Sequence, residues 1–140
     1  MNIEEIEISK LIPQRKPMIM IDKLLSFSEK EVRTSFKINK ENIFVESGVL
    51  QEVALIENIA QTAAAGSGYS AFSKSESPRK GFIGAVKKFE VYSLPKVNDV
   101  IETKLVITAE VLNASIVEGE VFCNNDLIAK AELKIFLLEN

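Results

Sequence analysis

The chain has 140 residues, of which 46% are hydrophobic and 26% charged, and its formal net charge is −3. These values are typical of one soluble globular domain, and the acidic balance argues against a nucleic-acid partner, because such proteins carry a basic excess. The N-terminal segment MNIEEIEISK lacks the basic and apolar regions of a secretory signal, and no apolar run is long enough for a membrane span. We therefore expect a cytoplasmic protein with a single domain over residues 1–140.

Two residue counts restrict the chemistry further. A single cysteine, Cys123, excludes an internal disulfide and a multi-thiolate metal site. The sequence contains no histidine, so it lacks the usual general base near neutral pH and the commonest ligand for transition metals. Acid–base chemistry within this chain must therefore use carboxylates, lysine, tyrosine, cysteine or water, and we expect no metal site.

The N-terminal third of the chain predicts an antiparallel hairpin followed by a loop. Residues 18–27 predict the first strand, and residues 31–39 alternate between apolar and polar side chains, as in a half-buried strand. The predicted inward-facing residues of this second strand are Val32, Thr34, Phe36 and Ile38. Glu29 and Lys30 form the expected turn, and residues 40–48 form the expected loop.

A long helix is predicted next. Residues 51–65 are rich in Ala, Leu and Glu, which are good helix formers. Gly66 and Gly68 weaken the C-terminal part of this helix, and the helical pattern fades near Phe72. The polar residues 73–81 then predict a surface linker.

The rest of the chain predicts four long strands. Their expected ranges are residues 81–93, 100–112, 115–123 and 126–138. The pair Asn124-Asn125 is a strong signal for a short hairpin turn. The expected inward-facing sets are Leu105, Ile107, Ala109 and Val111 in the second of these strands, and Leu127, Ala129, Ala131, Leu133, Ile135 and Leu137 in the last. The predicted fold class is α+β, with one helix covered by an antiparallel sheet, because nothing else in the chain can bury that helix.

The predicted helix carries a carboxylate, Glu57, among small residues. At 100° per residue, its flanks are Val53, Ala60 and Ala64 on one side and Ala54, Gln61 and Gly68 on the other. The expected core face, broadly opposite, consists of Leu55, Ile56, Ile59 and Ala63. The stripe around Glu57 is either the solvent edge of the helix or a surface for the close approach of a ligand. In the second case Gln61, one turn away, would orient Glu57.

Three stretches together resemble the β-hydroxyacyl-acyl-carrier-protein dehydratases. They are LIPQRKPMIMIDKLL (11–25), EVALIENIAQTAAAGSGY (52–69) and GFIGAVKKFEVYSLPKVND (81–99). Within that superfamily, the helix stretch is most similar to the dehydratase-like proteins of bacterial aryl-polyene pigment pathways. The resemblance implies a hotdog fold, with a curved sheet wrapped round a long central helix. It also implies a lyase of fatty-acid or polyene/polyketide-type biosynthesis that works as a homodimer.

The resemblance also assigns roles to residues. Glu57 matches the helix carboxylate that protonates the departing hydroxyl, and Gln61 matches the glutamine that follows it. The first turn of the helix, at Glu52 and Val53, corresponds to the backbone that offers an N–H to the thioester carbonyl. No cofactor is implied, since the substrate is carried on the phosphopantetheine of an acyl carrier protein or of CoA.

The chain departs from the family pattern where the base is expected. The histidine of the L-x-P-H-R opening is replaced by Gln14, and the stretch NIFVESGVLQEV before the helix contains no histidine either. Three functions stay open: a dehydratase with a carboxylate-centred site, an inactive homologue that binds acyl carrier protein or forms a heterodimer with an active hotdog subunit, and an acyl thioesterase.

Two basic pairs complete the candidate site residues. Arg79-Lys80 and Lys87-Lys88 are the main basic clusters of the sequence. They are either solvated surface residues or a docking site for an acidic carrier protein and the phosphate of its prosthetic arm.

Overall fold

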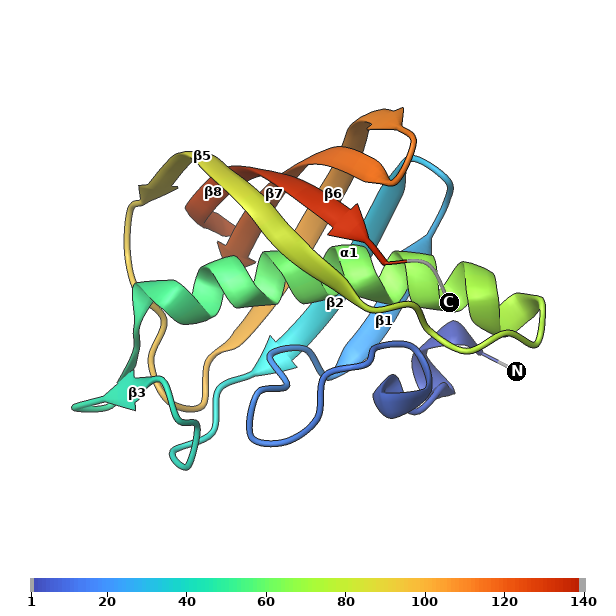
Figure 1. Ribbon diagram of the computed structural model, residues 1–140. Helices are drawn as coiled ribbons and strands as arrows, with labels where there is room; N and C mark the ends of the chain where they lie inside the picture. The colour runs from blue at the N-terminus through green and yellow to red at the C-terminus, as the bar shows by residue number, and fades with distance from the viewer. Residues whose placement is uncertain (1, 139–140) are drawn as a thin grey trace.

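The computed structural model describes residues 2–138 and shows a six-stranded antiparallel sheet arching over one long helix (Figure 1). The helix is α1 (Glu52–Ser73), and the sheet consists, in spatial order, of β1 (Lys23–Phe27), β2 (Glu31–Lys37), β6 (Val100–Val111), β7 (Ala114–Cys123), β8 (Asp126–Leu137) and β5 (Gly81–Val91). The remaining elements are the short 3-10 helices η1 (Ile3–Glu5) and η2 (Ile8–Lys10) and the small hairpin of β3 (Val45–Glu46) and β4 (Val49–Leu50). The hotdog architecture expected from the sequence is therefore confirmed. Of the domain predicted over residues 1–140, the residues 1, 139 and 140 lie outside the described part.

The helix ends close to the residue that its pattern predicted. The helical pattern fades near Phe72, and α1 ends at Ser73. A Cβ atom at Gly68 would lie 1.6 Å from the backbone oxygen of Leu11, and one at Gly66 would lie 2.6 Å from a methyl group of Val32. The two glycines therefore mark places where the N-terminal segment and β2 approach the helix closely, and they do not mark its end.

The first predicted strand is shorter than expected, because its beginning is bonded to the helix. β1 begins at Lys23, whereas residues 18–22 form no strand. The Met20 N–H donates to Gln61 Oε1 (2.7 Å), and Asn58 Nδ2 donates to the Met20 carbonyl (2.8 Å). Gln61 Nε2 also donates to the Met18 carbonyl (2.7 Å). Side chains of α1 thus satisfy backbone groups that a neighbouring strand would otherwise bond.

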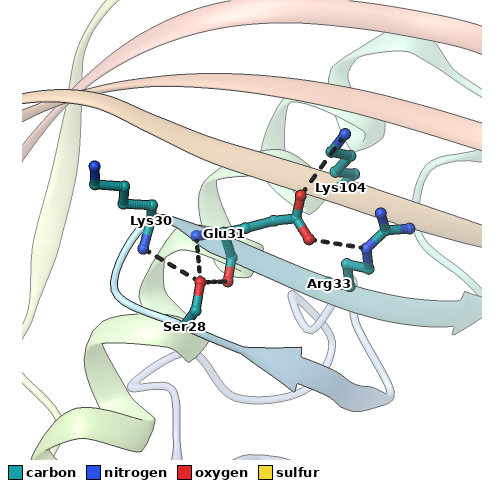
Figure 2. A network of polar contacts seen from close by, with 5 residues as sticks. All are labelled: Ser28, Lys30, Glu31, Arg33 and Lys104. Carbon is teal, nitrogen blue, oxygen red and sulfur yellow. Dashed lines mark hydrogen bonds and ion pairs between the residues drawn. The ribbon is translucent and has the colours of Figure 1, made fainter.

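Polar contacts hold the hairpin of β1 and β2 at its turn and against β6 (Figure 2). Ser28 Oγ accepts from the Glu31 N–H (3.1 Å) and the Lys30 N–H (3.4 Å). The Glu31 carboxylate lies 3.2 Å from Arg33 Nε and 3.7 Å from Lys104 Nζ. These ion pairs are partly exposed, and each contributes at most about 1 kcal/mol. They fix the position of the hairpin end on the sheet.

The C-terminal strands mostly follow the predicted pattern. Asn124 and Asn125 both have positive φ (52° and 68°), as a tight hairpin turn between β7 and β8 requires. In β6 the predicted alternation of inward-facing side chains ends at Ile107, because a bulge between Ile107 and Ala109 shifts the register with β7. Ala109 and Val111 are consequently exposed. In β8 the predicted inward-facing residues Ala129, Ala131, Leu133 and Ile135 are buried.

Candidate functional site

A cavity of about 720 Å³ lies between α1 and one end of the sheet. This volume falls within the range of small-molecule sites, about 300–1,000 Å³. The helix contributes Glu57, Ala60, Ala63, Ala64, Gly66, Ser67 and Ser70. The apolar wall from the sheet consists of Phe27, Val32, Phe82, Ile83, Ile107, Val117, Ile135 and Leu137. The cavity thus combines an apolar wall from the sheet with a helical side that carries one carboxylate, Glu57, and other polar residues also line it.

Of the flanking residues that the sequence placed around Glu57, Ala60 and Ala64 line this wall, whereas Ala54, Gln61 and Gly68 are buried and do not. Ala60 and Ala64 are half-buried against the cavity, so their small side chains leave space along the helix. Ala63 and Ile56, expected in the core, are only half-buried, and Ala63 lines the cavity. Val53, expected on the same flank as Ala60, is 53% exposed and does not line the cavity. The stripe is therefore a cavity wall over its middle part only.

Glu57 is half-buried and is held by its neighbour one turn later. Gln61 Nε2 donates to Glu57 Oε2 at 3.0 Å. Gln61 itself is 0% exposed, so it does not lie on a solvent edge of the helix, and its expected contact with Glu57 is present. The pair combines a carboxyl group that reaches the cavity with a buried amide that holds one of its oxygens.

Gln14 lines the same cavity as Glu57. The adjacent Pro13 is also part of the wall, and Arg15 Nη1 holds this segment by donating to the carbonyls of Ile12 (2.7 Å) and Gln14 (2.8 Å). Gln14 Oε1 is buried and has no hydrogen-bond partner among the described residues. The sequence position where the resemblance has a histidine therefore belongs to the same site as the carboxylate.

A second polar group on the helix, missed in the sequence, is structural. The fully buried Asn58 accepts from Thr103 Oγ1 (2.5 Å), and its backbone carbonyl accepts from Thr62 Oγ1 (2.9 Å). Thr34 Oγ1 lies 2.7 Å from Thr62 Oγ1. Polar residues at inward-facing strand positions, such as Thr34, are the sequence signal that could have revealed this network. Its members bond to one another, so they leave no group free for a ligand.

The predicted residues at the helix start lie apart from the cavity. Glu52 and Val53 are exposed in the first turn of α1 and do not line the cavity. The structure therefore brings Gln14, Glu57 and Gln61 together and leaves these two outside the group. Their predicted role toward a thioester carbonyl stays a prediction.

The four basic residues do not form one cluster. Arg79 lines the cavity, and its Nε donates to the Leu138 carbonyl (3.0 Å). Lys80 is exposed beside it. Lys87 and Lys88 are exposed farther along β5, where Lys88 Nζ lies 4.0 Å from Glu132 Oε1. Among the four, Arg79 is the one that lines the cavity.

Few titratable groups line the cavity. Within residues 2–138 they are Glu29, Glu57, Arg79 and Glu110. Cys123 is not among the lining residues, and burial raises the pKa of its thiol, which makes it a poor nucleophile. No group of three or more potential metal ligands occurs in this described part of the chain. Glu57 is therefore the acid–base candidate on the helix, and the cavity contains no imidazole.

No helix in residues 2–138 is long and apolar enough to cross a membrane.

Comparisons with known proteins show the family and the fold of this chain. The family model described as ApeP dehydratase matches residues 6–140. The 3-hydroxyacyl-[acyl-carrier-protein] dehydratases FabZ of Campylobacter lari and Campylobacter fetus are 22% and 23% identical, over 98% of this chain and 99% of each relative. Among solved structures, the dehydratase heterocomplex ApeI:P from Xenorhabdus doucetiae has a TM-score of 0.89 at 16% identity, covering 96% of this chain and 93% of the other.

A second solved structure is more distant. A hypothetical thioesterase from Streptococcus pneumoniae, solved with coenzyme A, has a TM-score of 0.67 at 11% identity and covers 84% of this chain and 86% of its own. At such identities, a structural likeness shows the shared fold alone.

Proposed function

The chain belongs to the ApeP-like dehydratase family, and on this premise we propose that it dehydrates β-hydroxyacyl thioesters with Glu57 as the acid–base residue. The observation that carries the proposal is the position of Glu57, a carboxylate held by Gln61 on the wall of an apolar cavity. The slot of small and apolar residues suits an acyl chain, and the carboxylate suits its β-hydroxyl group.

In the simplest form of the reaction, Glu57 performs both proton transfers. The carboxylate removes a proton from the α-carbon, and the electron pair of that C–H bond is held as an enolate of the thioester. This pair forms the double bond to the β-carbon as the C–O bond breaks, and the carboxylic acid gives its proton to the departing hydroxyl group. Water leaves, the enoyl thioester remains, and Glu57 returns to its starting form.

A second form divides the two steps between two subunits. The chain has no histidine, so no homodimer of it contains one. A different hotdog subunit would supply the imidazole base, while Glu57 protonates the hydroxyl group. The structural neighbour from Xenorhabdus doucetiae is described as a heterocomplex, which supports this arrangement for the present chain. One positioned acid–base group is worth about 10²–10⁴ in rate, so this form is expected to be the faster.

The substrate would reach the cavity on the phosphopantetheine of an acyl carrier protein or of CoA. Arg79 supports this part of the proposal, because its guanidinium is at the cavity and could pair with a phosphate. The reaction would belong to fatty-acid or polyene-type biosynthesis, including aryl-polyene pathways. Hydrolysis of the thioester is the competing function, since a helix carboxylate could also activate water and some solved neighbours are described as hypothetical thioesterases.

One assay separates these forms. The purified chain is incubated with β-hydroxyacyl carrier-protein thioesters, alone and with histidine-containing hotdog subunits that co-purify with it. Enoyl thioester and free thiol are measured in parallel. Enoyl product from the chain alone supports the one-carboxylate form, and product only with the second subunit supports the divided form. Release of thiol without enoyl product, or turnover unchanged by Glu57→Gln, would overturn the proposal.

A further inference from the structure

The side-chain amide of Gln14 has no hydrogen-bond partner among the described residues. Its Oε1 is buried, and within residues 2–138 it is the one buried side-chain oxygen or nitrogen of a non-exposed residue that lacks a partner. The bond that Gln14 accepts from Arg15 Nη1 (2.8 Å) goes to its backbone carbonyl and leaves the amide unpaired. A buried acceptor without a donor costs free energy, and most such groups in proteins are paired. The described part of the chain therefore does not supply the donor that this oxygen needs.

The backbone around Gln14 is fixed, so the amide stays at the cavity wall. Arg15 Nη1 donates to the carbonyl of Ile12 (2.7 Å) as well as to that of Gln14. The Met18 N–H donates to the Arg15 carbonyl (2.9 Å) and closes a tight turn directly after Gln14. Pro13 and Gln14 both line the cavity. The missing donor is therefore expected in the cavity.

The same turn connects Gln14 to the carboxylate. The Met18 carbonyl accepts from Gln61 Nε2 (2.7 Å), and this nitrogen also donates to Glu57 Oε2 (3.0 Å). Two hydrogen bonds that share one atom thus join Glu57 to the turn that follows Gln14. Because the side chains of Gln14 and Glu57 also line one cavity, a single bound molecule can contact both of them.

The chemistry of the amide restricts what the missing partner is. Oε1 accepts hydrogen bonds, so it needs an O–H or N–H group. The last torsion of a glutamine is soft, so Oε1 can turn towards the cavity without breaking a described hydrogen bond. Near the reacting carbons of a β-hydroxyacyl thioester, the β-hydroxyl is the group that can donate, since the thioester carbonyl only accepts. An enoyl or a saturated acyl chain has no donor at this position.

We propose that Gln14 accepts a hydrogen bond from the β-hydroxyl group and thereby makes the site specific for β-hydroxyacyl chains over enoyl and saturated ones. This inference rests on the proposed function, from which it takes the substrate. During dehydration, the carboxylic proton of Glu57 goes to the hydroxyl oxygen, whose own hydrogen points at Gln14 Oε1, and water leaves with both hydrogens. The enoyl product leaves the amide unpaired, so the site binds a new substrate molecule in preference to the product.

The test compares two ligands on a chain in which dehydration is suppressed. β-Hydroxyacyl- and saturated acyl-pantetheine amides of equal length are titrated into the Glu57→Gln chain, with and without Gln14→Met, and the dissociation constants are measured by calorimetry. Gln14→Met should weaken binding of the β-hydroxyacyl ligand about tenfold or more and leave that of the saturated ligand unchanged or tighter, because the unpaired oxygen is gone. Equal weakening of both ligands, an unchanged preference, or no binding of either ligand would overturn the proposal.

Further variants separate an acceptor role from a structural one. Gln14→Glu keeps an acceptor oxygen of the same reach and should retain the preference for the β-hydroxyacyl ligand; loss of the preference here would contradict the proposal. Gln51→Met makes the matched change at a residue that does not line the cavity, and it should alter neither dissociation constant. A lost preference in this control as well would also overturn the proposal. If Gln14→Met does not fold, Gln14→Leu replaces it.

The inference and the proposed function fail in different ways. Turnover by the natural chain tests the proposed function, whereas the ligand preference of the Glu57→Gln chain tests the role of Gln14. A preference that depends on Gln14 without any turnover refutes the proposed function and supports the inference. Turnover together with a preference that does not depend on Gln14 supports the proposed function and overturns the inference.

Discussion

The two sides of α1 place polar residues in opposite situations. On the packed side, Asn58, Gln61 and Thr62 are at most 1% exposed, and each is hydrogen-bonded to other parts of the chain. On the cavity side, Glu57 is half-buried and uses only one of its oxygens in a described hydrogen bond. Polar residues one helical turn apart thus hold the fold in one case and remain available for chemistry in the other. A polar side chain that lines a cavity and still has an oxygen without a hydrogen bond is therefore a better indicator of function than the type of residue alone.

Removal of the carboxylate on the cavity side should have the largest effect. Glu57→Gln keeps an acceptor for Gln61 Nε2 but cannot donate a carboxylic proton, so dehydration should fall about 10²–10⁴-fold. The melting temperature should change little, because Glu57 is half-buried. The matched control is Glu46→Gln, which changes an exposed carboxylate in β3 that does not line the cavity and should retain activity. Equal losses in the two variants would contradict the assignment.

On the packed side, Gly68→Ala should lower stability. The added Cβ would lie 1.6 Å from the Leu11 oxygen, a backbone atom that cannot move without displacing the N-terminal segment. We expect a loss of about 3 kcal/mol in the free energy of unfolding, measured by urea denaturation. Ser67→Ala, next to it on the cavity side, should change this free energy by less than about 0.5 kcal/mol. A stable Gly68→Ala chain would mean that the close approach is not required.

Loss of the buried amide of Asn58 should lower the free energy of unfolding without changing kcat. Asn58→Ala leaves Thr103 and the Met20 carbonyl without their partner, which should cost about 2 kcal/mol in the free energy of unfolding. The folded fraction should keep its kcat, since Asn58 does not contact Glu57. A loss of kcat in fully folded protein would place Asn58 in the site and remove the distinction between the two sides of α1.

A histidine at position 14 should increase the activity of the chain alone. Gln14 lines the same cavity as Glu57, so Gln14→His would place a base on the cavity wall. Because the new imidazole has no supporting partners, we expect about a tenfold gain, less than the 10²–10⁴ of a well-positioned group. Gln51→His adds a histidine that is not part of the cavity and should have no effect. The gain should be smaller when a histidine-containing partner is already bound.

The smallest expected effect is the contribution of Asp22 to the pH dependence of the free energy of unfolding. Burial raises the pKa of its carboxyl group above the usual 3.8, although the Lys37 N–H and the charge of Lys23 oppose this shift. The folded chain then binds the proton more tightly than the unfolded chain, so ionisation of Asp22 lowers the free energy of unfolding as pH rises through this range. Asp22→Asn should remove that fall, an effect below about 1 kcal/mol because the Asp22 side chain is only partly removed from solvent. Urea denaturation from pH 3 to about pH 7 measures it, and a parallel pH dependence in both proteins would contradict the assignment.

The sequence predicted the fold well where the local pattern and the tertiary contacts agree. β8 alternates as predicted from Ala129 to Ile135, and Asn124-Asn125 adopts the backbone that its turn needs. Leu127, expected inward, is only half-buried, because the register of β7 and β8 shifts beside it. The segment 18–22 was predicted as strand and is not, because its partners are side chains of α1, which no local pattern contains. The site shows the same division: Glu57 was predicted from helix geometry and resemblance, whereas the burial of Gln61 depends on a segment more than 40 residues away in the chain.

The central claim is that the cavity holds an acyl thioester with its β-hydroxyl group at Glu57. A crystal structure with a non-hydrolysable β-hydroxyacyl-pantetheine amide tests it most directly. We predict the β-hydroxyl group about 2.6–3.2 Å from a carboxylate oxygen of Glu57, with the acyl chain running along Ala60 and Ala64. An acyl chain bound outside this cavity, or a β-hydroxyl group directed away from Glu57, would contradict the account.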